Sequence, residues 1–272
     1  MTPSGGFIVP ADPMPHNQSI VAEHWFRPIL FGLAVAILAG GLVVGWLTWQ
    51  AAATAGRVGA DLTLYLDATR SALAGHGFYP AHQLAGPYTI ADGDILYPPP
   101  VIALFAPFLV LPAVLFWIVP TAIVAAVVLH HRPRPWTWPV MAFGLAFPIT
   151  TLKLVHGNPV MWITAATALG TVYAWPAVLV LVKPSLAPFA LIGVRHRSWW
   201  QALAVGVVIS AAFGPLWLDY ARVVLDSHNP AGALYSLDEM PLLMVPVIAC
   251  IGSPGFRAPV VFGAFRRRRA AA

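Results

Sequence analysis

Asp61 is the residue of this sequence whose type and position best suit catalysis. It opens Asp61-Leu-Thr-Leu-Tyr65, in a polar stretch that follows the first apolar segment of a hydrophobic chain. A carboxylate just outside a bilayer could take a proton from a substrate anchored in lipid, provided that it comes within hydrogen-bond reach. The alternative is a helix N-cap, a common stabilising role for Asp. Spacing alone favours the cap, so both interpretations stay open.

The residues after Asp61 predict a helix over residues 61–73 that packs on the membrane surface. Tyr65 lies four residues after Asp61 and therefore faces the same way. Asp67 lies on another face, where Arg70 is three residues away and can pair with it. The two aspartates therefore do not form a carboxylate pair.

Lys183 is the second candidate, because it interrupts the apolar run 178–189 directly before Pro184. A charge at membrane depth is costly and usually marks a functional cavity. The proline breaks the helix, and broken backbone at that depth is tolerated where it lines a cavity. Lysine is a good partner for phosphate, so we expect an anion site here. The alternative is a lysine that snorkels to the interface.

A few other polar residues are weaker candidates. Lys153, His156 and Arg222 could add positive charge near a phosphate. Asn158, which precedes Pro159, suits an N-cap followed by proline at the first helical position. Tyr65, Tyr97 and Asn158 are kept as cavity candidates. The sequence has no HExxH, CxxC or Walker pattern, so neither a metal nor a cofactor is expected.

The elements that must position these residues are membrane helices. Hydrophobic residues make up 59% of the 272 and charged residues 9%, whereas soluble domains carry about 25% charged residues. The single cysteine, Cys250, excludes an intramolecular disulfide. The basic clusters lie at the ends of apolar segments, as in cytoplasmic loops, so nucleic acid is not an expected partner. We predict an all-α, polytopic integral membrane protein.

Placing the basic clusters in the cytoplasm predicts the topology. Residues 1–27 form a cytoplasmic tail, residues 28–256 the membrane domain, and residues 257–272 a basic cytoplasmic tail, so both termini are cytoplasmic. Residues 51–97 and 218–240 form extracytoplasmic loops, and eight of the ten acidic residues fall in them. The predicted membrane segments are 28–49, a short re-entrant or interfacial segment 99–111 followed by a span to 129, 136–151, 160–171, two half-helices within 177–194, 199–217 and 240–251.

Several blocks of this sequence, between about residues 60 and 200, resemble glycosyltransferase family 87 of the GT-C superfamily. They are Asp61-Leu-Thr-Leu-Tyr65 with Phe78-Tyr79-Pro80, Tyr97-Pro98-Pro99 with Leu104-Phe105-Ala106-Pro107, His156-Gly157-Asn158, and Lys183-Pro184-Ser185 with Arg195-His196-Arg197. Their order and spacing are more specific than any single block. The chain is short for that family.

The resemblance implies a GT-C-like bundle in the cell membrane that transfers a mannose-like sugar. The donor would be a sugar on a polyprenyl phosphate, and the acceptor an extracytoplasmic glycan or glycolipid. Asp61 would be the general base and Lys183 would bind the donor phosphate, with Arg222 and His156 as lesser candidates. We expect Asp61 to face the cavity that holds Lys183. The alternative is a non-enzymatic protein, either a transporter of an anionic or lipidic solute or a degenerate scaffold, since a broken helix with a buried cation also suits transporters.

Overall fold

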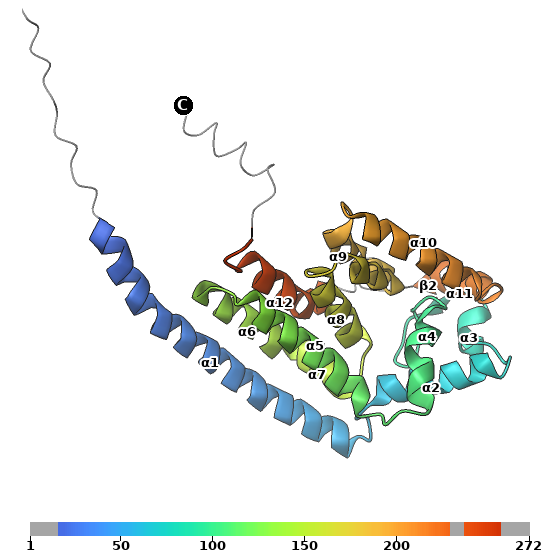
Figure 1. Cartoon of the computed structure of the whole chain (residues 1–272). Helices are drawn as coiled ribbons and strands as arrows, with labels where there is room; N and C mark the ends of the chain where they lie inside the picture. Colours follow the sequence, from blue (N-terminus) through green and yellow to red (C-terminus); the bar gives the residue numbers. More distant parts are fainter. Residues whose placement is uncertain (1–15, 229–236, 257–272) are drawn as a thin grey trace, which may run out of the picture.

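The computed structural model describes residues 16–228 and 237–256, and within them the chain is mostly helical (Figure 1). The longer helices are α1 (His16–Thr54), α2 (Ala60–Leu73), α5 (Leu115–His131), α6 (Trp138–Ala146), α7 (Pro148–His156), α8 (Val160–Gly170), α10 (Arg197–Ala211), α11 (Leu216–Leu225) and α12 (Met240–Ile251). The short elements are α3 (Ala81–Leu84), α4 (Val101–Phe105), η1 (Ala106–Leu109), η2 (Pro135–Thr137), η3 (Trp175–Val182), η4 (Pro184–Leu186), α9 (Ala187–Ala190), η5 (Leu191–Gly193), η7 (Leu237–Glu239) and the strands β1 (Tyr88–Thr89) and β2 (Ser227–His228).

Helix α1 has the length and composition of a membrane span. Its segment Phe26–Thr54 is the one continuous helix among the described residues that is long and apolar enough to cross a membrane. Up to three spans result if each of two bent helix pairs is counted as one. Helix α1 starts earlier than predicted, at His16, and runs as a long rod along one edge of the molecule, beside α6 and α7 (Figure 1).

Two of the predicted spans are not continuous helices. The segment predicted over 136–151 divides at Phe147 into α6 and α7, and the η2–α6 and α7 axes are bent by 52°. Phe147 is extended because Pro148 follows it, and proline disfavours helical backbone in the residue before it. The segment predicted over 199–217 ends as α10 at Ala211, and α11 leaves it at 98°. Gly214 and Pro215 separate these two helices.

The break at Lys183 is where the sequence predicts it. Lys183 has extended backbone (φ −122°, ψ 93°) between η3 and η4, as expected for a residue before proline. The flanking segments differ from the predicted half-helices, because η3 is an eight-residue 3-10 helix, η4 is a single 3-10 turn, and only the short α9 is α-helical. Helices α8 and α12 agree with the predicted segments 160–171 and 240–251.

The first predicted loop is a folded unit rather than an irregular connection. The side chain of Gln83 is fully buried. Its Oε1 accepts a hydrogen bond from the backbone N–H of Ile95 at 3.0 Å, and its Nε2 donates one to the Tyr88 hydroxyl at 2.9 Å. The Tyr88 hydroxyl in turn donates to the carbonyl of Val223 in α11 at 3.1 Å.

A short parallel strand pair joins the two predicted loops. Tyr88 of β1 lies opposite Ser227 of β2, and Thr89 lies opposite His228. The two predicted loops, 51–97 and 218–240, therefore meet through this strand pair at one end of the molecule, where α2, α3, α4 and α11 lie (Figure 1).

Aromatic side chains form the core beneath α2. The Tyr65 ring stacks on Phe105 with ring centroids 4.8 Å apart, and Phe105 stacks on Phe116 at 5.5 Å. Trp162 of α8 packs against Phe116 and donates its indole N–H to the Phe116 carbonyl at 3.1 Å. These contacts hold one face of α2 against the core. The position of Asp61, in the first turn of this helix, is thereby fixed.

Candidate functional site

Asp61 lies in the first turn of α2, but it is not the N-cap. The cap position is Gly59, whose left-handed backbone (φ 70°) makes the turn into the helix. The cap interpretation of Asp61 is therefore wrong, because the turn needs a positive φ that glycine adopts most easily. The backbone N–H of Gly59 donates to the Val155 carbonyl of α7 at 3.0 Å, which holds the start of α2 against α7.

The carboxylate of Asp61 is held by residues at the end of α7. The side-chain amide of Asn158 donates to Asp61 Oδ2 at 2.6 Å, and Nδ1 of His156 lies 4.0 Å from Oδ1. About a quarter of the Asp61 side chain, 27%, is exposed. A carboxylate in the first turn of a helix also interacts favourably with the helix dipole. The Asp61 carboxylate is thus held in one orientation, and it remains partly exposed at the protein surface.

Asn158 has two roles in this arrangement. Its Oδ1 accepts a hydrogen bond from the backbone N–H of Val160 at 3.0 Å and so satisfies a donor at the start of α8, although the cap position itself is Pro159 and not Asn158 as the sequence predicts. Its amide nitrogen serves Asp61 at the same time. The turn between α7 and α8 therefore fixes both the start of α8 and the carboxylate on α2.

Lys183 forms a buried ion pair with Glu239 of η7. Its Nζ lies 2.6 and 2.5 Å from the two carboxylate oxygens of Glu239. The side chains are only 7% and 2% exposed. Sequence reasoning missed Glu239 as a site residue, because the acids of the second loop carry no signal that separates a buried one from its neighbours.

Lys153 is a second cation on the same carboxylate. Its Nζ lies 3.6 Å from Glu239 Oε1, and 28% of its side chain is exposed. Lys153 and His156 are three residues apart on α7, so they lie on one side of that helix. Helix α7 therefore carries His156 beside Asp61 and Lys153 beside the Lys183–Glu239 pair.

Aromatic rings connect Lys183 to α2, the helix that carries Asp61. Tyr65, one turn after Asp61, packs edge-on against Tyr97 with centroids 5.4 Å apart. Lys183 Nζ lies 5.2 Å from the Tyr97 ring centroid, within the range of a cation–π interaction. Asp61, Lys183, His156, Asn158, Tyr65 and Tyr97 therefore belong to one connected group of residues.

Arg222 is not joined to this group by any described contact. It lies on α11 with 64% of its side chain exposed, 3.7 Å from Asp219 one turn earlier. Asp67 pairs with Arg70 at 2.6 Å, as predicted, on the exposed face of α2.

The remaining acids of the first loop hold the loop together. Asp94 accepts a hydrogen bond from the backbone N–H of Ala91 at 2.7 Å and contacts His82 Nε2 at 2.6 Å. Asp92 pairs with Arg57, and the hydrogen bond and charge of that guanidinium lower the pKa of the Asp92 carboxyl. These acids therefore have structural partners of their own.

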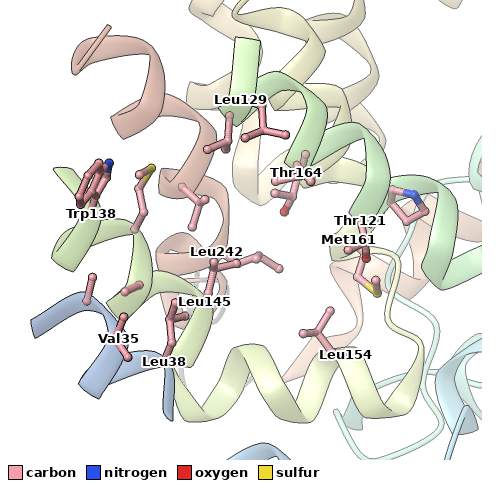
Figure 2. A pocket seen from close by; sticks show the side chains of 18 of the residues that line it. Val35, Leu38, Thr121, Leu129, Trp138, Leu145, Leu154, Met161, Thr164 and Leu242 are labelled. Atoms are coloured by element: carbon pink, nitrogen blue, oxygen red, sulfur yellow. The ribbon is translucent and has the colours of Figure 1, made fainter. Parts of the chain in front are cut away.

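An open apolar cavity of about 560 Å³ lies between α1, α5, α6, α8 and α12 (Figure 2). Figure 2 shows side chains from all five helices turned toward it, including Val35, Thr121, Trp138, Met161 and Leu242. Leu154, which follows Lys153 in α7, also lines it. Since Leu242 lies only three residues after Glu239, this side of the cavity is close to the charged residues.

No group of three or more His, Cys, Asp or Glu side chains suited to a metal ion occurs in residues 16–228 and 237–256. Comparison with known proteins finds no match: no protein-family model, no curated protein and no solved structure is significantly similar to this chain.

Proposed function

We propose that this protein is a membrane glycosyltransferase that moves a sugar, mannose-like by the resemblance described above, from a polyprenyl phosphate to an extracytoplasmic glycan or glycolipid. The observation that carries the proposal is the group of contacts around α7. One end of this helix orients the Asp61 carboxylate through Asn158, and Lys153 of the same helix meets the buried Lys183–Glu239 pair. Helix α7 and the turn after it thus contact the base on α2 and carry one of the two lysines that meet Glu239.

The chemistry assigned to these residues is a single displacement. Asp61 accepts the proton of the acceptor hydroxyl, whose oxygen forms a bond to the anomeric carbon. The bond from that carbon to the phosphate oxygen breaks, and the phosphate leaves with the electron pair. Fixed positive charge near the leaving oxygens stabilises the developing negative charge, and Lys183 and Lys153 supply it. The displacement inverts the anomeric carbon.

The apolar cavity supports a lipid-linked donor. Its walls are aliphatic and aromatic side chains of α1, α5, α6, α8 and α12, and it is open at the surface. A polyprenyl chain in this cavity would bring its phosphate toward Lys153 and Glu239, which are neighbours of the lining residues Leu154 and Leu242. The orientation proposed from the basic clusters places both termini in the cytoplasm and this end of the bundle outside.

The test is sugar transfer in proteoliposomes from a defined polyprenyl-phosphate donor. Asp61→Asn keeps the hydrogen-bonding shape but removes the base, so we expect the transfer rate to fall by a factor of about 100 or more. Asp67→Asn is the matched control, because it makes the same change on the exposed face of the same helix. Equal rates in wild type, Asp61→Asn and Asp67→Asn would contradict the role of Asp61.

A second function is favoured by the closed pairing of Lys183. Broken helices at a buried site are also expected in a transporter of an anionic or lipidic solute, and here Glu239 already balances the charge of Lys183. The same proteoliposomes decide between the two. Transbilayer movement of the lipid phosphate without sugar transfer would favour the transporter.

A further inference from the structure

We propose that Lys153 and Lys183 form one anion site whose occupant in this structure is the protein's own Glu239, and that a phosphate group binds by displacing that carboxylate. The inference extends the proposed function to the regulation of its phosphate site. It also stands as a binding claim that needs no transfer activity.

The geometry around Glu239 is that of a bound anion. Lys183 contacts both carboxylate oxygens, at 2.6 and 2.5 Å, and Lys153 lies 3.6 Å from one of them. The two lysines come from elements far apart in sequence, α7 and the break between η3 and η4. Two cations that converge on two oxygens would serve a phosphate as well as a carboxylate, since lysine binds phosphate as a point charge.

The positions of these side chains would allow a phosphate group to replace the Glu239 carboxylate. Glu239 and Lys183 are almost fully buried, whereas Lys153 is 28% exposed and so connects the pair to the surface. Glu239 ends η7, a single three-residue turn, so a change in its side-chain rotamer or in that turn would free both lysines. A ligand has to compete with Glu239, and its apparent affinity falls with the fraction of molecules in which the site is open.

Asp238 provides an internal comparison. It is adjacent to Glu239 and has one carboxylate oxygen buried without a hydrogen-bond partner, but it makes no ion pair within 4.0 Å among the described side chains. Removing the charge of Asp238 therefore changes the local field without removing the occupant. Removing the charge of Glu239 changes the local field and also removes the carboxylate that occupies the site.

The experiment measures binding to the full chain in nanodiscs by equilibrium dialysis, with labelled inorganic phosphate in one arm and farnesyl phosphate in the other. We expect Glu239→Gln to bind farnesyl phosphate about tenfold more tightly than wild type, the factor for a site that is open in about a tenth of the molecules. Because Asp238→Asn leaves Glu239 in the site, it should change the affinity by less than about threefold. Adding Lys153→Gln to Glu239→Gln should remove most of the gain.

The two dialysis ligands distinguish a lipid phosphate from the free anion. Comparison with sugar transfer by wild type separates the anion-site proposal from the proposed glycosyltransferase function. A gain for farnesyl phosphate alone identifies a lipid phosphate, and an equal gain for inorganic phosphate identifies the free anion. Equal gains in Glu239→Gln and Asp238→Asn, or no gain in Glu239→Gln, would overturn displacement of the carboxylate. If Glu239→Gln binds more tightly but wild type transfers no sugar, the result supports the anion site and contradicts the glycosyltransferase function.

Glu239→Gln leaves Lys183 without its counter-ion, so folding needs its own check. Glu239→Asp keeps the charge but shortens the side chain by one methylene group, which weakens the contact with Lys183. It should bind farnesyl phosphate about two- to threefold more tightly than wild type. If neither variant yields folded protein, Glu239 is an indispensable structural counter-ion and the displacement proposal is wrong.

Discussion

At the scale of single residues, Asp61 depends on a neighbour that sequence patterns assign to another task. Asn158 accepts a hydrogen bond from the N–H of Val160 at the start of α8, and it also donates to Asp61. Both contacts come from one side chain whose two polar atoms point in different directions. The orientation of Asp61 is thus coupled to the start of a helix that lies far away in the sequence.

Two substitutions separate these roles of Asn158. Asn158→Ala removes both contacts and leaves the N–H of Val160 without its acceptor, so it should lower the stability by about 1–2 kcal/mol. Asn158→Ser keeps a good capping oxygen but lacks the donor that reaches Asp61, so its stability should stay near that of wild type while sugar transfer falls. Thermal melting in detergent and the transfer assay measure the two effects. If both variants lose stability and activity in parallel, Asn158 acts on Asp61 only through the fold.

The sequence predicts contacts that are local and misses those that are distant. The Asp67–Arg70 pair and the break at Lys183 follow from a spacing of three residues and from one proline. The partners of Lys183 and Asp61, Glu239 and Asn158, come from other elements. A pattern with a period of 3.6 residues carries no information about which distant helices meet, so these contacts require the folded chain.

At the scale of elements, helices meet where small residues allow their backbones to approach. A Cβ added to Gly41 of α1 would collide with the Cβ and Cα of Ala146 in α6. Close approach at small residues is a usual way for membrane helices to associate. A Cβ added to the preceding residue, Gly40, would have no neighbour within 4 Å.

Adjacent glycines therefore give a matched pair of variants. Gly41→Ala should loosen α1 from α6 and lower the stability by about 1–3 kcal/mol, the usual cost of overpacking. Gly40→Ala should leave it unchanged or raise it by up to about 1 kcal/mol, because alanine is the better helix former. Unfolding in detergent compares them, and an equal response to the two substitutions would show that α1 does not pack on α6 through Gly41.

Proline explains where the elements depart from the sequence prediction. A long apolar run predicts a span, and composition alone gives no reason to divide it. Phe147 is nevertheless extended because Pro148 follows it. The break at Lys183, which the sequence predicts, has the same cause.

At the scale of the whole molecule, the parallel pair of β1 and β2 brings the two polar loops together. Thr89 and His228 lie opposite one another in this pair, and neighbouring strands are about 4.8 Å apart, within the range that a disulfide can bridge. The pair thus offers a direct test of the proposed arrangement of the loops.

We expect Thr89→Cys with His228→Cys to form a disulfide in cells, on the side of the membrane where disulfides form. Electrophoresis with and without reductant detects it, and a membrane-impermeant thiol reagent labels each single variant from outside. His76→Cys with His228→Cys is the control, since these positions are not paired. Labelling only after the membrane is opened would place both loops on the cytoplasmic side and contradict the proposed topology.

The same strand pair sets the order in which the protein can assemble. Gln83 and Tyr88 are synthesised early. The hydrogen bond from Tyr88 to the Val223 carbonyl and the pairing of β1 with β2 can form only after α11 has been made. Contacts between distant parts of a chain form slowly, because the intervening loop must first be closed. The first loop is therefore incompletely folded until α11 has been made. During that interval the segment that carries Asp61 is open to chaperones and proteases.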